Sequence, residues 1–242
     1  MLDDSLPSKS ASLAPPPAKK GWGVVGGTMW AFVAYFGPQF VLIPLLPLLQ
    51  IFKLDSNVKL FVVQALLQIL TLAVLFLVIR RYGLAWPSIG LERFKLPYAW
   101  LAIVAFPIYL LAAVIIANVV AYVYPVNLQQ IQDIGFHAIR GPEIALVFIA
   151  LVIITPLTEE IIFRGFLFRA YRQDFGFWIG TLLVSLIFAV AHGQLNVGLD
   201  VFALSILLCY VREKTGSLWP AIMLHALKNL VAFVILFIIN PK

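Results

Sequence analysis

Charged residues are scarce in this sequence: Asp, Glu, Lys and Arg make up only 12% of its 242 residues, whereas 62% are hydrophobic. Soluble domains carry about 25% charged and about 45–50% apolar residues. The chain therefore lacks the polar side chains to cover a surface in water, which predicts an integral protein of the lipid bilayer. The same composition disfavours a disordered chain, a secreted disulfide scaffold and a nucleic-acid-binding protein.

Cysteine is nearly absent as well. Cys209 is the one cysteine, so no disulfide can form within the chain, and its place in an apolar run indicates a packing role. Lysine and arginine number 17 against 11 acidic residues. Because most of these basic residues lie beside or between apolar segments, membrane topology explains them without a nucleic-acid partner.

Long apolar segments fill most of the chain and predict an all-α, polytopic transmembrane helix bundle of about seven spans. Pro38, Pro44 and Pro47 in the first segment remove helical hydrogen bonds. We therefore expect that segment to be kinked, re-entrant or split, so that six to eight spans fit the sequence. The segments are Trp22–Ile51, Val58–Ile79, Tyr98–Tyr124, Glu143–Tyr171, Phe177–His192, Val197–Val211 and Trp219–Ile239.

Residues 1–20 differ from the rest of the chain. They contain three consecutive prolines and several serines, with too little apolar area to offset the entropy of ordering. We expect a disordered basic leader here, followed by one transmembrane helical domain over residues 21–242.

Basic residues recur at alternate ends of the apolar segments. Loops rich in lysine and arginine remain in the cytoplasm, so this pattern predicts a cytoplasmic N-terminus. The residues concerned are Lys19, Lys20, Arg80, Arg81, Arg93, Lys95, Arg169, Arg172, Arg212 and Lys214.

A small set of polar side chains lies inside the apolar segments. An ionisable group in hydrocarbon costs several kcal/mol, so such a group is a functional candidate by default. The set comprises Glu159, Glu160, Arg164, His192, His225 and Asn229.

Glu160 and Arg164 lie four residues apart, on one face of a helix, so their charges can pair and reduce the cost of burial. Glu159 points about 100° away and has no cation on its own face, which makes it the candidate base. The alternative is that both glutamates lie at a frayed helix end in water.

Two further pairs have helical spacing. Phe188 and His192 share one face, and so do His225 and Asn229. Each pair alone is also compatible with an interfacial anchor or an interhelical hydrogen bond.

A helical hairpin turning near Asp174–Gly176 would bring Glu159 and His192 to one level. Glu159 lies 16 residues before Phe175 and His192 lies 17 residues after it, about 24 Å from the turn in both cases. His225 is less well placed. It lies only nine residues after Gly216, so it can meet the others only with an uneven turn depth or a helix break near Pro220.

This constellation suits peptide-bond hydrolysis. A glutamate beside a histidine can take a proton from water and deliver one to the leaving amine, while a second histidine and an amide can stabilise the oxyanion. A zinc site built from Glu159, His192 and His225 is the competing interpretation. The sequence has no His-Glu-x-x-His pair, which favours a mechanism that requires no cofactor. Ser185, Ser205 and Cys209 lack the motifs of a catalytic nucleophile.

The three motifs together resemble the CPBP group, the CAAX proteases and bacteriocin-processing enzymes also called the Abi family. They are Glu159-Glu160-x-x-x-Arg164, Phe188-x-x-x-His192 and His225-x-x-x-Asn229, within a core of about residues 143–235. By resemblance to type II CAAX prenyl proteases, the chain would be an intramembrane endopeptidase acting on a membrane-associated or lipidated peptide.

The resemblance also implies residue roles. Glu159 and His192 would activate the water, His225 and Asn229 would form the oxyanion hole, and Arg164 would support both glutamates. Family members are often labelled metalloproteases, which leaves a zinc-dependent mechanism open. Two other functions remain open: a non-catalytic scaffold or bacteriocin immunity protein that binds a peptide in the same pocket, and a proton-coupled transporter.

Overall fold

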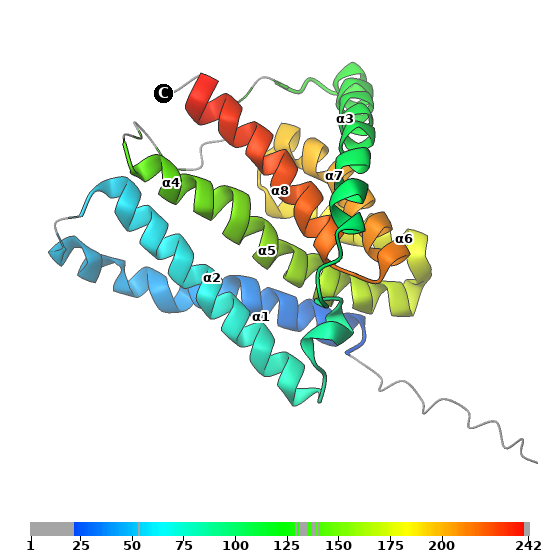
Figure 1. Ribbon diagram of the computed structural model, residues 1–242, viewed down its shortest axis with the longest axis horizontal. Coiled ribbons are helices and arrows are strands. Elements are labelled where there is room, and N and C mark those ends of the chain that lie inside the picture. Colours follow the sequence, from blue (N-terminus) through cyan, green and yellow to red (C-terminus); the bar gives the residue numbers. More distant parts are fainter. Residues whose placement is uncertain are drawn as a thin grey trace, which may run out of the picture.

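The computed structural model describes residues 22–52, 54–128, 130, 135–136, 139 and 141–239. Every regular element among these residues is helical (Figure 1). Six helices are long and apolar enough to cross a membrane. The predicted all-α transmembrane bundle is therefore confirmed, whereas the expected leader lies outside the described residues.

The first two spans form one pair. α1 (Val24–Leu42) continues into a 3₁₀ helix (Ile43–Ile51) where Pro44 and Pro47 prevent regular helical bonding, as the prolines predict. α2 (Ser56–Arg81) begins at Asp55, whose side chain caps the amide of Asn57, and packs against α1.

α3 (Pro97–Val123) covers another side of the molecule, where it packs on α7 (Leu195–Thr215) and α8 (Trp219–Phe233) (Figure 1). Pro97 and Pro220 lie in the first turns of α3 and α8, where the missing N–H has no helical partner to lose. α8 ends in a π-helical turn (Val234–Ile239).

A continuous helical segment of 49 residues, Glu143–Ala191, contains α4 (Glu143–Phe148), α5 (Thr155–Glu160) and α6 (Phe168–Ala191). Two π-helical stretches, Ile149–Ile154 and Ile161–Leu167, flank α5. A straight helix of this length would span more than twice the hydrocarbon core. The glutamate pair thus lies between two departures from regular α-helix, a feature often associated with functional sites.

The long segment reverses direction at Gly176. This residue has φ 79° and ψ 179°, a conformation open to glycine and outside the helical region. The hairpin expected near residues 174–176 is therefore confirmed. It divides one of the six long helical segments into two spans, which gives about seven spans in all. Gly180 lies where the two arms meet: a Cβ there would be 2.9 Å from the backbone nitrogen of Arg172.

A connecting segment that contains a short 3₁₀ helix (Trp86–Ile89) covers one end of the bundle. In this cap segment, defined as residues 82–96, the Ser88 carbonyl accepts a 2.6 Å bond from Arg169 and the Ile89 carbonyl a 3.0 Å bond from Arg212. Gly90 has φ 93° and lies against the Arg212 guanidinium, so no side chain fits there. Eight basic residues therefore gather at this end: Arg80, Arg81, Arg93, Lys95, Arg169, Arg172, Arg212 and Lys214.

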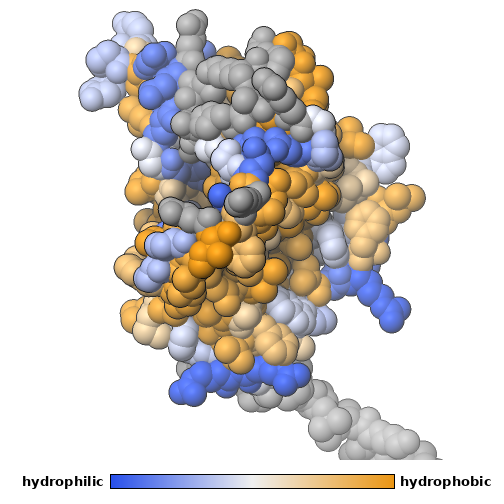
Figure 2. Space-filling model, turned by 90° about the vertical axis from the view of Figure 1, so that its left-hand side faces the viewer, coloured by the Kyte–Doolittle hydropathy of each residue, from blue (hydrophilic) through white to orange (hydrophobic). Residues whose placement is uncertain are grey.

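Apolar side chains face outward around the middle of the molecule. Figure 2 shows a hydrophobic surface across the middle and hydrophilic residues toward the upper and lower ends. Exposed residues of this kind include Leu111 and Val114 on α3 and Trp178, Leu186 and Val190 on α6. Such a surface is stable in lipid and identifies a multi-pass membrane protein.

We expect Gly180→Ala to lower the free energy of unfolding by about 1–3 kcal/mol, the usual cost of overpacking. Its Cβ would meet backbone atoms of Tyr171 and Arg172 at 3.0 and 2.9 Å, and backbone cannot move aside locally. Thermal unfolding in detergent measures the effect. Gly37→Ala is the matched control, because the nearest atom to its Cβ is 3.9 Å away; an equal loss of stability in both variants would contradict the packing argument.

Candidate active site

A buried ionic cluster joins Glu160, Arg164 and His225. The Oε1 atom of Glu160 accepts a 2.8 Å bond from Arg164 and a second 2.8 Å bond from Nδ1 of His225. Glu160 and Arg164 are fully buried and His225 is 2% exposed. The predicted Glu160–Arg164 pair is confirmed, and the alternative of two glutamates at a frayed helix end is wrong.

Phe188 connects this cluster to the other histidine. The Arg164 guanidinium carbon lies 4.5 Å from the centre of the Phe188 ring, and the rings of His192 and His225 both meet Phe188 edge-on, with centroids 4.8 and 5.9 Å away. The aromatic ring stabilises the cation and separates the two imidazoles. Phe188 therefore positions all three groups, a role that the sequence pattern alone did not reveal.

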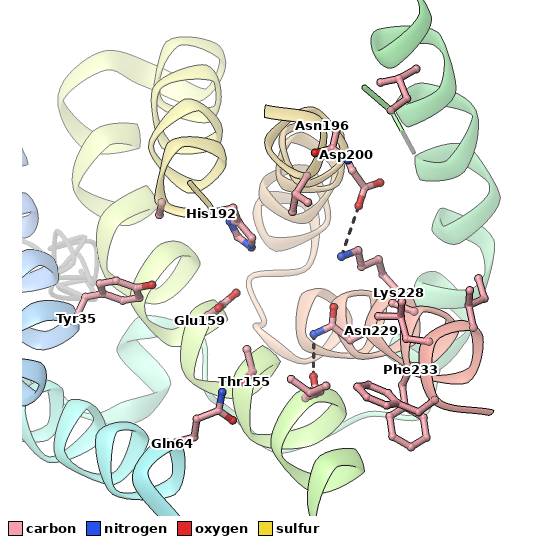
Figure 3. A pocket seen from close by; sticks show the side chains of 18 residues that line it. Tyr35, Gln64, Thr155, Glu159, His192, Asn196, Asp200, Lys228, Asn229 and Phe233 are labelled. Carbon is pink, nitrogen blue, oxygen red and sulfur yellow. Dashed lines mark hydrogen bonds and ion pairs between the residues drawn. The ribbon is translucent and has the colours of Figure 1, made fainter. Parts of the chain in front are cut away.

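Glu159 points the other way, into a cavity of about 630 Å³ that it helps to line (Figure 3). Its side chain is 18% exposed, and its Oε2 lies 3.8 Å from Nε2 of His225. The His225 ring is thus flanked by a carboxylate at each nitrogen: Glu160 from behind and Glu159 from the cavity side.

His192 ends α6 and lines the same cavity. Its Nδ1 donates a 2.8 Å bond to the carbonyl of Phe188, which fixes the ring orientation. Figure 3 shows the His192 ring and the Glu159 carboxylate facing the same open space from α6 and α5. The equal depth expected from the hairpin arithmetic agrees with this placement.

α8 supplies the two other predicted residues. His225 reaches the glutamates although its distance from the preceding turn had suggested a mismatch: α8 runs unbroken from Trp219 to Phe233 and brings Nδ1 of His225 to 2.8 Å from Glu160. One turn further, Asn229 lines the cavity and donates a 2.8 Å bond to the Leu151 carbonyl. One of its two amide hydrogens is used in this way.

Several cavity residues were not predicted. Tyr35 and Gln64 come from α1 and α2, where the sequence has no motif, and Asp200 and Lys228 come from α7 and α8. The rule that singled out Glu159, a charge within an apolar segment, applies equally to Asp200 and Lys228 and could have found them. No sequence signal distinguishes Tyr35 from the other aromatic residues.

The described residues contain no group of three His, Cys, Asp or Glu side chains that could hold a metal ion. The zinc set of Glu159, His192 and His225 is therefore unsupported by the described residues. Ser185, Ser205 and Cys209 are buried and do not line the cavity, so none is placed as a nucleophile.

Two curated relatives align with part of the chain. An "Uncharacterized 24.3 kDa protein" of Escherichia coli is 30% identical over 89 residues, 35% of this chain and 41% of that protein. A "Putative membrane peptidase YdiL" of Bacillus subtilis (strain 168) is 30% identical over 98 residues, 40% of this chain and 39% of that protein. The alignments thus span about two fifths of each relative, and no solved structure gives a significant match.

A family comparison covers the segment that carries the site. Residues 141–231 match the family described as "Type II CAAX prenyl endopeptidase Rce1-like". This segment contains all three motifs and every predicted site residue, from Glu159 to Asn229. The resemblance to type II CAAX prenyl proteases is confirmed for this part of the chain.

Proposed function

We propose that this protein is an intramembrane endopeptidase that hydrolyses a peptide bond in a membrane-associated or lipidated peptide. The observation that carries the proposal is that Glu159 and His192, from two different spans, face one cavity. The family match over residues 141–231 and the similarity to a membrane peptidase support the same activity.

In this mechanism the Glu159 carboxylate accepts a proton from a water molecule in the cavity as its oxygen attacks the peptide carbonyl carbon. His192 orients the water through its ring, which the Phe188 carbonyl holds in place. The proton then passes to the leaving amine as the carbon–nitrogen bond breaks, and the products are a free carboxylate and a free amine.

The oxyanion needs donors on the cavity wall. Asn229 lies there and has a second amide hydrogen besides the one bonded to Leu151. The resemblance assigns His225 to the same task. The His225 ring is 2% exposed, and its Nε2 faces Glu159, which lies between the ring and the cavity. We therefore assign His225 to holding Glu159 in place.

We expect Glu159→Gln to reduce peptide cleavage by about 10²–10⁴-fold, the usual contribution of a general base, because an amide cannot accept the proton. Cleavage of a peptide library by protein in lipid nanodiscs measures the loss. Glu213→Gln is the matched control, since Glu213 lies at the basic end and pairs with Arg172.

His192→Gln should reduce peptide cleavage by a factor in the same range. Unchanged cleavage in both site variants would contradict the mechanism. A folded Glu159→Gln protein that keeps its cellular function would instead favour the alternative of a scaffold or immunity protein that only binds a peptide in this pocket.

The ionic cluster gives a separate prediction. Arg164→Met should lower stability by about 3–5 kcal/mol, because it leaves the Glu160 carboxylate buried without its cation. The double variant Glu160→Leu/Arg164→Met removes both charges and should recover most of that stability while cleavage stays low, since His225 has lost the acceptor for Nδ1. Recovery of cleavage together with stability would show that the cluster does not position the site.

Membrane orientation follows from the basic residues at the cap-segment end. By the positive-inside rule that end, and with it the N-terminus, faces the cytoplasm. Cys209 is buried, so introduced cysteines can be labelled against a low background. In intact cells an impermeant maleimide should label Leu54→Cys but not Lys95→Cys. Leu54 lies just before α2, Lys95 lies in the cap segment that follows α2, and both are exposed. The reverse labelling pattern would overturn the orientation.

A further inference from the structure

Four buried polar side chains on α6 and α7 have no part in the mechanism above. Thr181 and Ser185 lie one turn apart on α6, and Ser205 and Cys209 lie one turn apart on α7. Each of the four is at most 1% exposed. Burying a polar group is costly unless it has a hydrogen-bond partner, so we looked for the group that these side chains serve.

The Arg164 guanidinium has donors that the ionic cluster does not use. One N–H of Nη1 donates to Glu160. Nε and Nη2 carry three further N–H groups, which are buried and have no partner of regular hydrogen-bond geometry among the described residues. The Ser185 hydroxyl is buried without such a partner as well. A cation buried in this way is stabilised by any further acceptor within reach.

Cys209 is in contact with both of these groups. Its thiol interacts with the Arg164 guanidinium and with the Ser185 hydroxyl. The helix positions agree, because Ser185 lies three residues before Phe188 on one face of α6, and the guanidinium carbon lies 4.5 Å from the centre of the Phe188 ring. α7 packs on α6 and on the π-helical stretch that carries Arg164. A thiol can accept through its sulfur and donate its S–H, so it can join the cation to the hydroxyl.

We infer that Cys209 and Ser185 are positioning residues for Arg164. The Cys209 sulfur accepts a hydrogen bond from the guanidinium, and the thiol donates its own hydrogen to Oγ of Ser185. Both residues are fully buried, so they act from within the packed helices and do not contact substrate.

A chain of contacts connects this thiol to the candidate base. Arg164 held by Cys209 keeps Nη1 on Glu160, and Glu160 binds Nδ1 of His225. Nε2 of His225 faces Glu159. The orientation of Glu159 therefore depends on a neutral hydrogen bond made between two other spans. This consequence rests on the proposed function, whereas the contact itself does not.

Infrared spectroscopy tests the contact without any cleavage. The S–H stretching band lies in a spectral window without other protein bands, and the chain has one cysteine, so the band belongs to Cys209 alone. A thiol that donates a hydrogen bond absorbs at a lower frequency than a free thiol. In wild-type protein in detergent we expect a band below that of butanethiol in hexane. Ser185→Ala should raise it to the free position.

Two further variants assign the band shift. Glu160→Leu/Arg164→Met removes the cation without leaving an unpaired carboxylate and should raise the band part of the way, because a bond accepted from a cation strengthens the thiol as a donor. Ser205→Ala is the matched control and should leave the band unchanged, since this serine is equally buried and does not interact with the thiol. A wild-type band at the free position overturns the inference. So does a low band that Ser185→Ala does not move, because the thiol then donates elsewhere.

Cleavage kinetics test the positioning role. Cys209→Ala should lower kcat about fivefold, the effect of one neutral hydrogen bond, and leave KM unchanged, because Cys209 does not line the cavity. Cys209→Ser keeps a donor and an acceptor at this place and should restore most of kcat. Thermal unfolding in detergent shows that each variant is folded. Wild-type kcat in Cys209→Ala, or equal losses in the alanine and serine variants, would show that the polar contact does not position the site.

The two measurements separate this inference from the proposed function. If the wild-type protein cleaves no peptide, the proposed function fails, while the infrared band still decides whether Cys209 joins Arg164 to Ser185. If the band responds as expected and kcat does not, the contact stands and the positioning role is wrong.

Discussion

The structure depends on one buried carboxylate that is bound from two directions. Glu160 has no exposed surface, and Arg164 one turn away and His225 from another span each lie 2.8 Å from the same oxygen, which offsets the cost of burying the carboxylate. This cluster joins α8 to the segment around α5. It also fixes the face of α5 that turns inward, which leaves the adjacent Glu159 facing the cavity.

The surrounding helices follow from that constraint. Two π-helical stretches on either side of α5 and the reversal at Gly176 bring His192 back opposite Glu159. Phe188 fills the space between Arg164 and the two imidazoles. The site is therefore built from three spans in the C-terminal half of the chain, on rigid elements rather than on loops, as a preorganised site requires.

Much of this arrangement could be predicted from local spacing. The Glu160–Arg164 pair and the Phe188–His192 pair need only helix geometry, and the hairpin at Gly176 follows from one glycine between two apolar segments. The depth of His225 could not be predicted, because it depends on where α8 begins relative to α6. Tyr35 and Asp200 reach the cavity through packing between spans, which no single segment encodes. The roles of the site residues and the proposed leader remain predictions.

The central claim is that water, activated between Glu159 and His192, attacks the peptide bond directly. Cleavage in H₂¹⁸O followed by mass spectrometry of both products and intact protein tests it most directly. The account predicts one solvent oxygen in each newly formed carboxylate during the first turnover and no covalent adduct on the protein. A peptide covalently attached to the protein, or a first-turnover product without solvent oxygen, would contradict it.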